Sequence, residues 1–434
     1  MASSSPILNN VETHSLSGGR AAAFGEVILS GARVDGHLIL RDAAFGEVIL
    51  NVARVDGHLV LDKATVTGLL NMNSLQVGQD LSMSGTQAPA TFQEVILTVA
   101  KVDGHLVLSG AKVEGLLNMN GLQVGQTLSM RGTQAPAINL GFAHITRNLD
   151  LSGAELKSFD LSAARIEGEL GMGSSGDSAT LWAEKDAHIN LHNAHVGILQ
   201  DWAALDREAK YWRSSWPNDA SLQLDGFTYD RLGRFDPRAN QEIEAGEEML
   251  HERPVTWYLN WLRRDETFSP QPYEYLAATF RKAGEADKAD DVLYASRERV
   301  REQAKPRLRW WGLSLLKYTI SYGIGSGYFF LPLFWVVGLA IASTIILFAA
   351  GQPVTCDIVD QPSGCLSNRL ADSSMAARFV YSLGQVLPIV ELDPAHKNVQ
   401  LTGWVWLWFV LLVRPFGYVL AGAIVAGMAG LTQK

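Results

Sequence analysis

Three histidines, His188, His192 and His195, form the densest group of side chains in this sequence that could bind a metal ion. In an extended segment successive side chains point to opposite faces, so His188 and His192 share one face and His195 points to the other. A metal site needs ligands that converge on one point. We therefore expect a surface cluster that holds no metal.

Charged residues in the apolar last third of the chain are the second group that could do chemistry. Arg414 interrupts an apolar stretch, and Glu391 and Asp393 lie in the segment before it. A charge within a membrane span is costly and normally has a partner or a water-filled cavity. We expect Arg414 to pair with Glu391 or Asp393, or else to lie at an interface where Pro415 breaks the span. In an oligomer the carboxylates could instead form a cation-selective ring.

The two cysteines of the chain, Cys356 and Cys365, lie nine positions apart in one loop, with a Pro-Ser-Gly turn between them. Two lone cysteines in one short loop favour a disulfide in an oxidising compartment. Two reduced thiols are the alternative.

No enzyme motif is present in the sequence. The glycine-rich spacings never stand between a strand and a helix, as a nucleotide-binding loop requires. The net charge is −9, with the acidic excess in residues 1–296, which gives no support to phosphate contacts with nucleic acid. We therefore expect no catalytic residue, no cofactor and no nucleic-acid partner.

The first part of the chain is organised by a repeat that runs from Gly25 to about Met172. Val34-Asp35-Gly36-His37-Leu38 recurs 21 residues later at 55–59 and again at 102–106, and residues 68–90 recur almost whole at 115–137. Apolar residues alternate within each unit, which is typical of strands. A repeat of about 21 residues suits one coil of a right-handed parallel β-helix, with glycines at the sharp turns. His37 and His58 are then one coil apart and should stack on the outer wall.

The predicted layout has four parts. Residues 1–24 are a loose lead-in, and residues 25–232 are the β-helix with a C-terminal cap that includes Trp202, Trp212 and Trp216. Residues 233–306 hold a helical hairpin, with helices over 273–283 and 285–303 separated by Gly284. Residues 307–434 form a membrane domain.

Two apolar stretches, 328–350 and 403–431, are each long enough to cross a hydrocarbon core of roughly 30 Å. A basic cluster precedes the first stretch and should place that flank, the solenoid and the C-terminus in the cytoplasm, with the loop 351–402 on the other side. The cluster consists of Arg297, Arg299, Arg301, Lys305, Arg307 and Arg309. Residues 1–6 lack the features of a signal peptide, which agrees with a cytoplasmic solenoid.

The segment 374–393, between the two stretches, has a helical apolar face made of Phe379, Leu383, Val386 and Val390. Two-span ion channels place a pore helix and a filter loop at this point, although the glycine-rich potassium filter is replaced by Leu-Pro-Ile-Val-Glu. An amphipathic helix on the outer membrane surface is the simpler interpretation.

Several segments together resemble a known group of proteins. The repeats are similar to the pentapeptide-like, quadrilateral β-helix class. The segments 224–232, 270–277, 381–383 and 387–390 resemble a bacterial family of membrane-attached repeat proteins often labelled "membrane-associated oxidoreductase". The resemblance implies an inner-membrane location and a redox cofactor, but the sequence holds no dinucleotide loop, haem motif or CxxC pair to bind one.

We therefore expect a membrane-anchored, non-enzymatic scaffold whose cytoplasmic β-helix binds a protein partner. Solenoids offer long regular surfaces for such partners. The alternative is a homo-oligomeric, two-span, channel-like protein gated through its solenoid.

Overall fold

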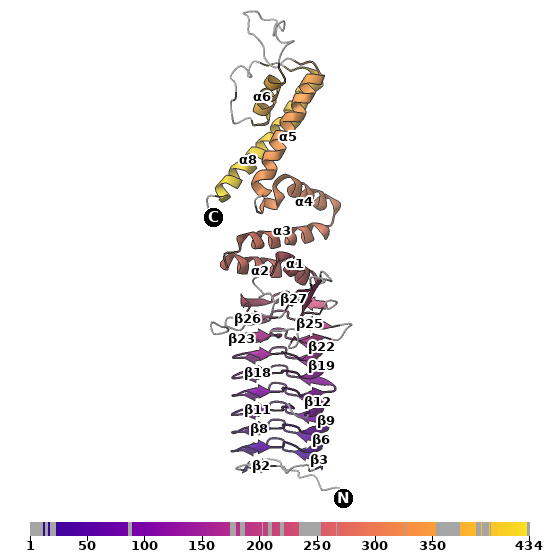
Figure 1. Ribbon diagram of the computed structural model, residues 1–434, viewed down its shortest axis with the longest axis vertical. Helices are drawn as coiled ribbons and strands as arrows, with labels where there is room; N and C mark the ends of the chain where they lie inside the picture. The colour runs from indigo at the N-terminus through magenta and orange to yellow at the C-terminus, as the bar shows by residue number, and fades with distance from the viewer. Residues whose placement is uncertain are drawn as a thin grey trace, which may run out of the picture. The chain divides into compact units, whose positions relative to one another are not determined.

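The computed structural model, drawn in Figure 1, places most of the chain. It divides into two compact units, Met1–Glu285 and Ala286–Lys434, and each is described by itself. The described residues are 12–13, 16–17, 23–85, 89–173, 179–182, 187–201, 203–206, 211–217, 221–233, 253–265, 267–325, 327–352, 374–387, 392, 399 and 401–431.

The first unit is a parallel β-solenoid, as the repeat predicts (Figure 1). Equivalent residues of successive coils pair in parallel, such as Val27 with Val48 and Val34 with Val55. One wall consists of β3 (Ala23–Ile28), β6 (Ala44–Ile49), β9 (Thr65–Asn71), β12 (Thr91–Ile96), β15 (Lys112–Val113), β16 (Leu116–Asn118), β19 (Gln134–Asn139), β22 (Glu155–Asp160), β24 (Leu181–Trp182), β25 (His188–Asn190) and β29 (Ser221–Gln223).

The opposite sheet has two short strands in most coils, so each coil bends at several corners. Its strands are β1 (Glu12–Thr13), β2 (Leu16–Ser17), β4 (Arg33–Val34), β5 (Leu38–Ile39), β7 (Arg54–Val55), β8 (Leu59–Val60), β10 (Gln76–Val77), β11 (Leu81–Ser82), β13 (Lys101–Val102), β14 (Leu106–Val107), β17 (Gln123–Val124), β18 (Leu128–Ser129), β20 (His144–Ile145), β21 (Leu149–Asp150), β23 (Arg165–Gly171), β26 (His195–Gln200) and β30 (Thr228–Leu232).

The solenoid core is a set of columns in which like residues stack. In one coil Phe45, Val48, Leu50 and Val55 are at most 2% exposed, and the next coil buries Val66, Leu70, Met72 and Val77 at the equivalent places. Alternation within a strand sends one side chain inward and the next outward. Stacking therefore turns a weak pattern within one coil into a continuous apolar interior.

The glycines have two roles, and the sequence predicts one of them. Gly121 lies at a coil corner with φ +68°, as expected of a turn glycine. Gly57 has no such φ; a Cβ there would lie 2.5 Å from the Gly36 carbonyl oxygen of the neighbouring coil. Gly57 is therefore needed for close stacking of coils. Corner positions equivalent to Gly121 are taken by Val52, Val99 and Phe142, also with positive φ.

The last coils lead into a cap of two helices, α1 (Val255–Arg263) and α2 (Pro270–Lys282). A short antiparallel pair, β27 (Ala203–Asp206) and β28 (Tyr211–Ser214), precedes them. Trp216 is 2% exposed and packs edge-on against Trp261 of α1, with ring centroids 5.4 Å apart. The predicted aromatic cap is thus present at Trp216, whereas Trp202 lies outside the described residues.

The second unit contains helices only among the residues that the structure describes. They are α3 (Ala286–Glu302), α4 (Arg307–Ile320), the short turn η3 (Ser321–Gly323), α5 (Gly327–Ala349), α6 (Met375–Val386), α7 (Gly403–Leu407), η5 (Trp408–Val413) and α8 (Arg414–Leu431). The stretches Phe330–Ala349 and Gly403–Gly422 are long and apolar enough to cross a membrane. Both were predicted from the sequence; α4 as a separate helix was not.

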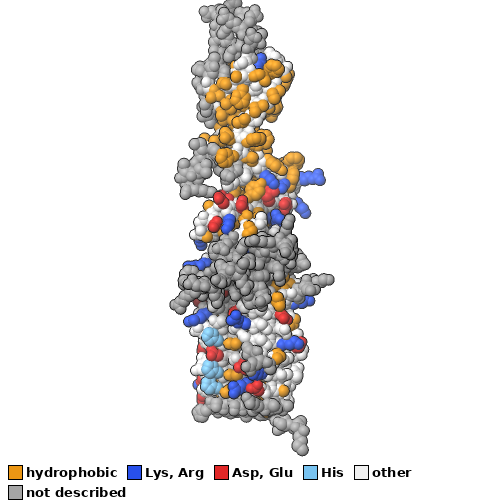
Figure 2. All heavy atoms as spheres, viewed as in Figure 1, with side chains coloured by type: hydrophobic (Ala, Val, Ile, Leu, Met, Phe, Trp, Pro, Cys, Tyr) orange, Lys and Arg blue, Asp and Glu red, His pale blue; other side chains and the backbone are white. Residues whose placement is uncertain are grey.

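Helices α5, α6 and α8 share one apolar core. The core includes Ala340 and Leu347 of α5, Tyr381 of α6, and Phe409 and Val413 of the second apolar stretch, all at most 2% exposed. Large apolar side chains also remain exposed along these helices, and Figure 2 shows hydrophobic side chains gathered on the surface of this unit. A soluble protein rarely leaves so continuous an apolar surface uncovered.

Candidate functional site

A groove of about 480 Å³ crosses the wall of β15, β19, β22 and β24 on the solenoid. Its apolar part includes Pro136, Leu181 and Trp182, and Leu181 is 53% exposed. The Trp182 indole is held in place because its Nε1 donates to the Ser215 carbonyl oxygen at 2.6 Å.

Polar and charged side chains surround this groove, and four of them are paired with one another. Lys112 Nζ lies 2.7 Å from Glu114 Oε1, and Gln134 Nε2 donates to Glu155 Oε2 at 3.0 Å. An exposed aliphatic and aromatic floor with a polar rim is the usual composition of a protein-binding surface. The groove is therefore the first candidate site. Sequence reasoning missed it because β24 reaches the wall from beyond the insertion at 173–176.

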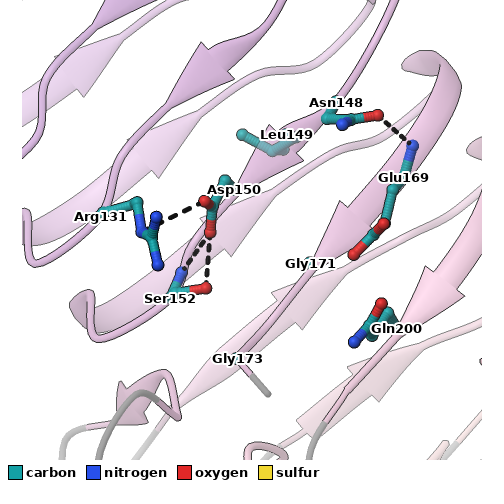
Figure 3. A pocket seen from close by; sticks show the side chains of 9 residues that line it. All are labelled: Arg131, Asn148, Leu149, Asp150, Ser152, Glu169, Gly171, Gly173 and Gln200. Atoms are coloured by element: carbon teal, nitrogen blue, oxygen red, sulfur yellow. Dashed lines mark hydrogen bonds and ion pairs between the residues drawn. The ribbon is translucent and has the colours of Figure 1, made fainter. Parts of the chain in front are cut away.

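A smaller polar pocket of about 190 Å³ lies where β21, β23 and β26 run side by side, as Figure 3 shows. Asp150 accepts a hydrogen bond from the Ser152 hydroxyl at 2.6 Å and lies 3.4 Å from Arg131. Asn148 Oδ1 accepts from the Glu169 backbone N–H at 2.9 Å. These groups satisfy one another, whereas Gln200 Oε1, which also lines the pocket, is buried without a hydrogen-bond partner among the described residues.

A column of acceptors runs along the outer wall, and Figure 2 shows histidine side chains aligned there. His37 Nδ1 accepts from the His58 backbone N–H at 2.9 Å, His58 Nδ1 from that of Asp80 at 3.1 Å, and Asp80 Oδ1 from that of His105 at 2.7 Å. The rings of His37 and His58 stack 5.1 Å apart, as the repeat predicts. The column joins consecutive coils and needs Nδ1 unprotonated.

The three clustered histidines, His188, His192 and His195, do not share a hydrogen-bond partner within the described part of the chain. His195 Nδ1 is 3.0 Å from the Thr228 hydroxyl, and His192 Nε2 is 2.9 Å from Asn193 Nδ2, while His188 pairs through its backbone in β25. Among the described residues no group of His, Cys, Asp or Glu side chains is arranged to hold a metal ion.

The joint between the solenoid and its cap contains a fully buried ion pair that the sequence did not reveal. Arg253 Nη1 lies 2.8 Å from Asp201 Oδ1, with both side chains 0% exposed. The Trp216 indole donates to Asp201, and the Arg253 guanidinium lies 4.4 Å over the Trp257 ring. Burial raises the pKa of the nearby Tyr258 hydroxyl, which stays neutral. This cluster holds α1 against the last coil.

In the helical unit, α6 lies against α5 and α8, and one arginine fixes its first turn. Arg378 is 7% exposed and donates to the Leu347 carbonyl oxygen at 2.9 Å and to that of Gln352 at 3.0 Å. The first carbonyl is in the last turn of α5 and the second is three residues beyond its end, in the region of partial negative charge at a helix C-terminus. Arg378 therefore caps α5 and attaches α6 to it.

The other end of α6 reaches the middle of the second apolar stretch. Arg414 Nε donates to Gln385 Oε1 at 2.8 Å, and the Val386 carbonyl lies so close to Gly417 that any Cβ there would overlap it. Phe416 in turn packs edge-on against Trp335 near the start of α5, with centroids 6.3 Å apart. Helix α6 therefore extends back alongside α5 over a length of roughly 18 Å.

Several predicted site residues lie outside the described residues: Glu391, Asp393, Cys356 and Cys365. The partner that the structure gives Arg414 is Gln385, a neutral residue not considered from the sequence. The buried face of α6 also differs from the predicted one. Arg378, Tyr381, Ser382 and Val386 are buried, whereas Phe379 and Leu383 are half-buried, because α6 packs against two helices at once.

Glu298 of α3 is the hub of the charged cluster between α3, α4 and η3. Its carboxylate accepts from Lys317 at 2.8 Å, from Arg301 at 2.9 Å and from the Tyr322 hydroxyl at 2.5 Å. Burial opposes ionisation, but the three hydrogen bonds outweigh it and lower the pKa of Glu298 to about 2. Tyr322 has φ 55°, a strained value for a non-glycine residue, and the bond to Glu298 helps hold it there.

The predicted basic cluster is thereby split into two kinds of residue. Arg301 is bound by Glu298, and Arg299 has a partner as well. Arg307 and Arg309 in the first turn of α4 are exposed, and their side chains make no ion pair or hydrogen bond with another described residue.

Comparison with protein-family models, with curated proteins and with solved structures finds no match to this chain, so its function has to be argued from these residues.

Proposed function

We propose that the protein is a membrane-anchored, non-enzymatic scaffold whose solenoid binds a protein partner in the groove around Leu181 and Trp182. The observation that carries the proposal is the apolar, half-exposed floor of that groove within a polar rim that includes the Lys112–Glu114 ion pair. A partner that covers Leu181 gains roughly 25 cal/mol for each Å² of apolar surface removed from water.

The test is site-specific photo-crosslinking of the full chain in cells. A photoreactive residue replaces Leu181 in the groove or, as the control, Val99 at a solenoid corner; both side chains are more than half exposed. We expect one discrete adduct from position 181 and none of the same mass from position 99. The same adducts from both positions, or none from 181, would reject the groove as the binding site.

The two apolar helices support an anchor, and the finer placement extends that proposal: a bacterial inner membrane, the solenoid in the cytoplasm, and the loop 351–402 on the other side. Reporter fusions before Arg297 and at Lys434 should report cytoplasm, and a fusion within 357–364 should report the opposite side. A cytoplasmic signal from 357–364 would overturn the orientation and the Cys356–Cys365 disulfide together.

A second candidate is a homo-oligomeric channel-like assembly, and the position of α6 favours it. A helix between two spans that turns back alongside the first span to the depth of Arg414 has the form of a re-entrant pore helix, not of a helix on the membrane surface.

Oligomeric state separates the two candidates, because a pore on a symmetry axis needs a ring of subunits. Mass measurement of the full chain in lipid nanodiscs should give one chain per particle for the scaffold and a closed ring for the channel. A strict monomer across lipid compositions would end the channel proposal.

A further inference from the structure

Helix α4 carries an exposed apolar stripe that no described part of the chain covers. Leu308 is 81% exposed, Trp311 66%, Leu315 60% and Tyr318 60%. Their spacing of three or four residues places them on one face of the helix. The opposite face packs inward through the buried Ser314 and through Lys317, which is held by Glu298.

Unpaired arginines border this stripe on both sides. At 100° per residue, Arg307 and Arg309 fall on opposite flanks of the line through Leu308 and Leu315. Neither side chain has a partner among the described residues, whereas Arg301 and Lys317 on the inner side are both paired with Glu298. The free positive charge of α4 is thus concentrated beside the apolar surface.

The stripe adjoins the apolar surface of the first candidate span. The Trp335 indole of α5 donates to the Tyr318 carbonyl oxygen at 2.6 Å, and Phe334 beside it is 74% exposed. With 14 residues, α4 is roughly 21 Å long, too short to cross a hydrocarbon core of roughly 30 Å.

We propose that α4 is an interfacial helix that lies in the plane of the bilayer, with its apolar stripe at the headgroup–acyl boundary and with Arg307 and Arg309 binding the phosphates of anionic lipids. An apolar face bordered by arginines is the composition that such helices share. This inference rests on the proposed membrane anchor and adds the lipid class and the residues that recognise it.

The depth of α4 is tested by spin labels on the full chain in phosphatidylcholine/phosphatidylglycerol nanodiscs, in a background with Cys356→Ser and Cys365→Ser. Labels at Leu315→Cys on the stripe, Ile341→Cys on α5 and Lys157→Cys on the solenoid are all at exposed positions, so they disturb no packing. We expect positions 315 and 341 to be accessible to oxygen and shielded from a water-soluble nickel chelate, with 315 the shallower. Position 157 should show the reverse.

The outcomes separate the two claims. Chelate access at 315 with shielding at 341 overturns the interfacial helix and leaves the anchor standing, whereas access at both positions overturns the anchor itself. Exclusion of both reagents at 315 together with spin–spin broadening would mean that a second copy covers the stripe, and this also overturns the proposal.

Lipid charge is tested with unlabelled protein and spin-labelled lipids. The preference for phosphatidylglycerol over phosphatidylcholine should fall about fivefold for each of Arg307→Gln and Arg309→Gln. Lys157→Gln is the matched control and should leave the preference unchanged. An unchanged preference in the double Arg307→Gln/Arg309→Gln variant would overturn the assignment of anionic lipid to these residues.

Discussion

The solenoid and the helical unit satisfy their polar groups in opposite ways. In the solenoid a side chain of one coil accepts a hydrogen bond from the backbone of the next coil, and the same position does so in successive coils, as at His37, His58 and Asp80. In the helical unit a single side chain makes hydrogen bonds to several groups at once, as those of Arg378 and Glu298 do. Stability is therefore distributed over equivalent positions in one unit and concentrated on individual residues in the other.

The largest expected effect tests whether equivalent positions in neighbouring coils contribute equally to the free energy of unfolding. Leu81 and Leu106 pair directly in neighbouring coils and are both 0% exposed. Leu81→Ala and Leu106→Ala should each lower the free energy of unfolding of the solenoid by about 2–5 kcal/mol, and by similar amounts. The measurement is urea unfolding of the full chain in detergent, followed by circular dichroism. Leu116→Ala, at a partly exposed position, should change little; clearly unequal costs at 81 and 106 would contradict distributed stability.

The next effect tests concentration on one residue in the helical unit. Arg378→Met removes two charge-assisted hydrogen bonds to the end of α5 and should cost roughly 3 kcal/mol. The amount of folded, monodisperse protein recovered from membranes measures it. Arg414→Leu is the control: it loses one exposed bond to Gln385 and removes a charge from an apolar stretch, so recovery should equal or exceed that of the parent. A loss with Arg414→Leu as large as that with Arg378→Met would refute the assigned roles.

A smaller effect is expected at Glu298 and depends on pH. Its pKa is about 2 in the folded protein and ordinarily 4.5, so its ionised form stabilises the fold above pH 4.5. That contribution should be lost as the pH falls from about 4.5 to 2. We expect Glu298→Gln to cost roughly 1–2 kcal/mol at pH 7, allowing for solvent screening, and to cost little at pH 2. Thermal unfolding at both pH values measures it, and an equal cost at both would show that the charge has no part in it.

The smallest effect concerns the solenoid corners, where equivalent positions of successive coils are occupied by different types of residue. Val99 has φ 56° and is 59% exposed, while Gly121 one coil later has φ +68°. Val99→Gly should stabilise the solenoid by about 1 kcal/mol, and Gly121→Val should destabilise it by a similar amount. Unfolding midpoints in urea measure both. Changes of the same sign in the two variants would mean that side-chain contacts, not backbone strain, decide the corner residue.

The sequence predicted the stacked coils and both apolar stretches because each rests on many residues that agree. One local exception shows the limit of that agreement. The hexapeptide Gly-Thr-Gln-Ala-Pro-Ala occurs at 85–90 and at 132–137. In the second copy Gln134 and Ala135 belong to β19, whereas after the first copy the strand β12 begins only at Thr91. Phe92 takes the inward place there, opposite Val66.

The candidate sites were less predictable for a different reason. Arg378 is one arginine in an ordinary amphipathic helix. Its structural role depends on the carbonyls of Leu347 and Gln352, which only the tertiary fold places beside it. Glu298 likewise gains its three donors from α3, α4 and η3 together. No spacing within one element indicates such convergence. The groove needs β24, which follows an insertion in the repeat.

The short reach of the coil pairing bears on how the chain is made. Arg33 pairs with Arg54, and Val55 with Val77, so each of these coils needs only the next 21 or 22 residues to become complete. A ribosome adds roughly 5–20 residues per second, so coils can dock one after another as they leave the exit tunnel. The whole stack is then folded before α5 and α8 are synthesised. A solenoid completed at that stage would have to unfold before it could cross a membrane, so the order of synthesis supports the cytoplasmic placement proposed above.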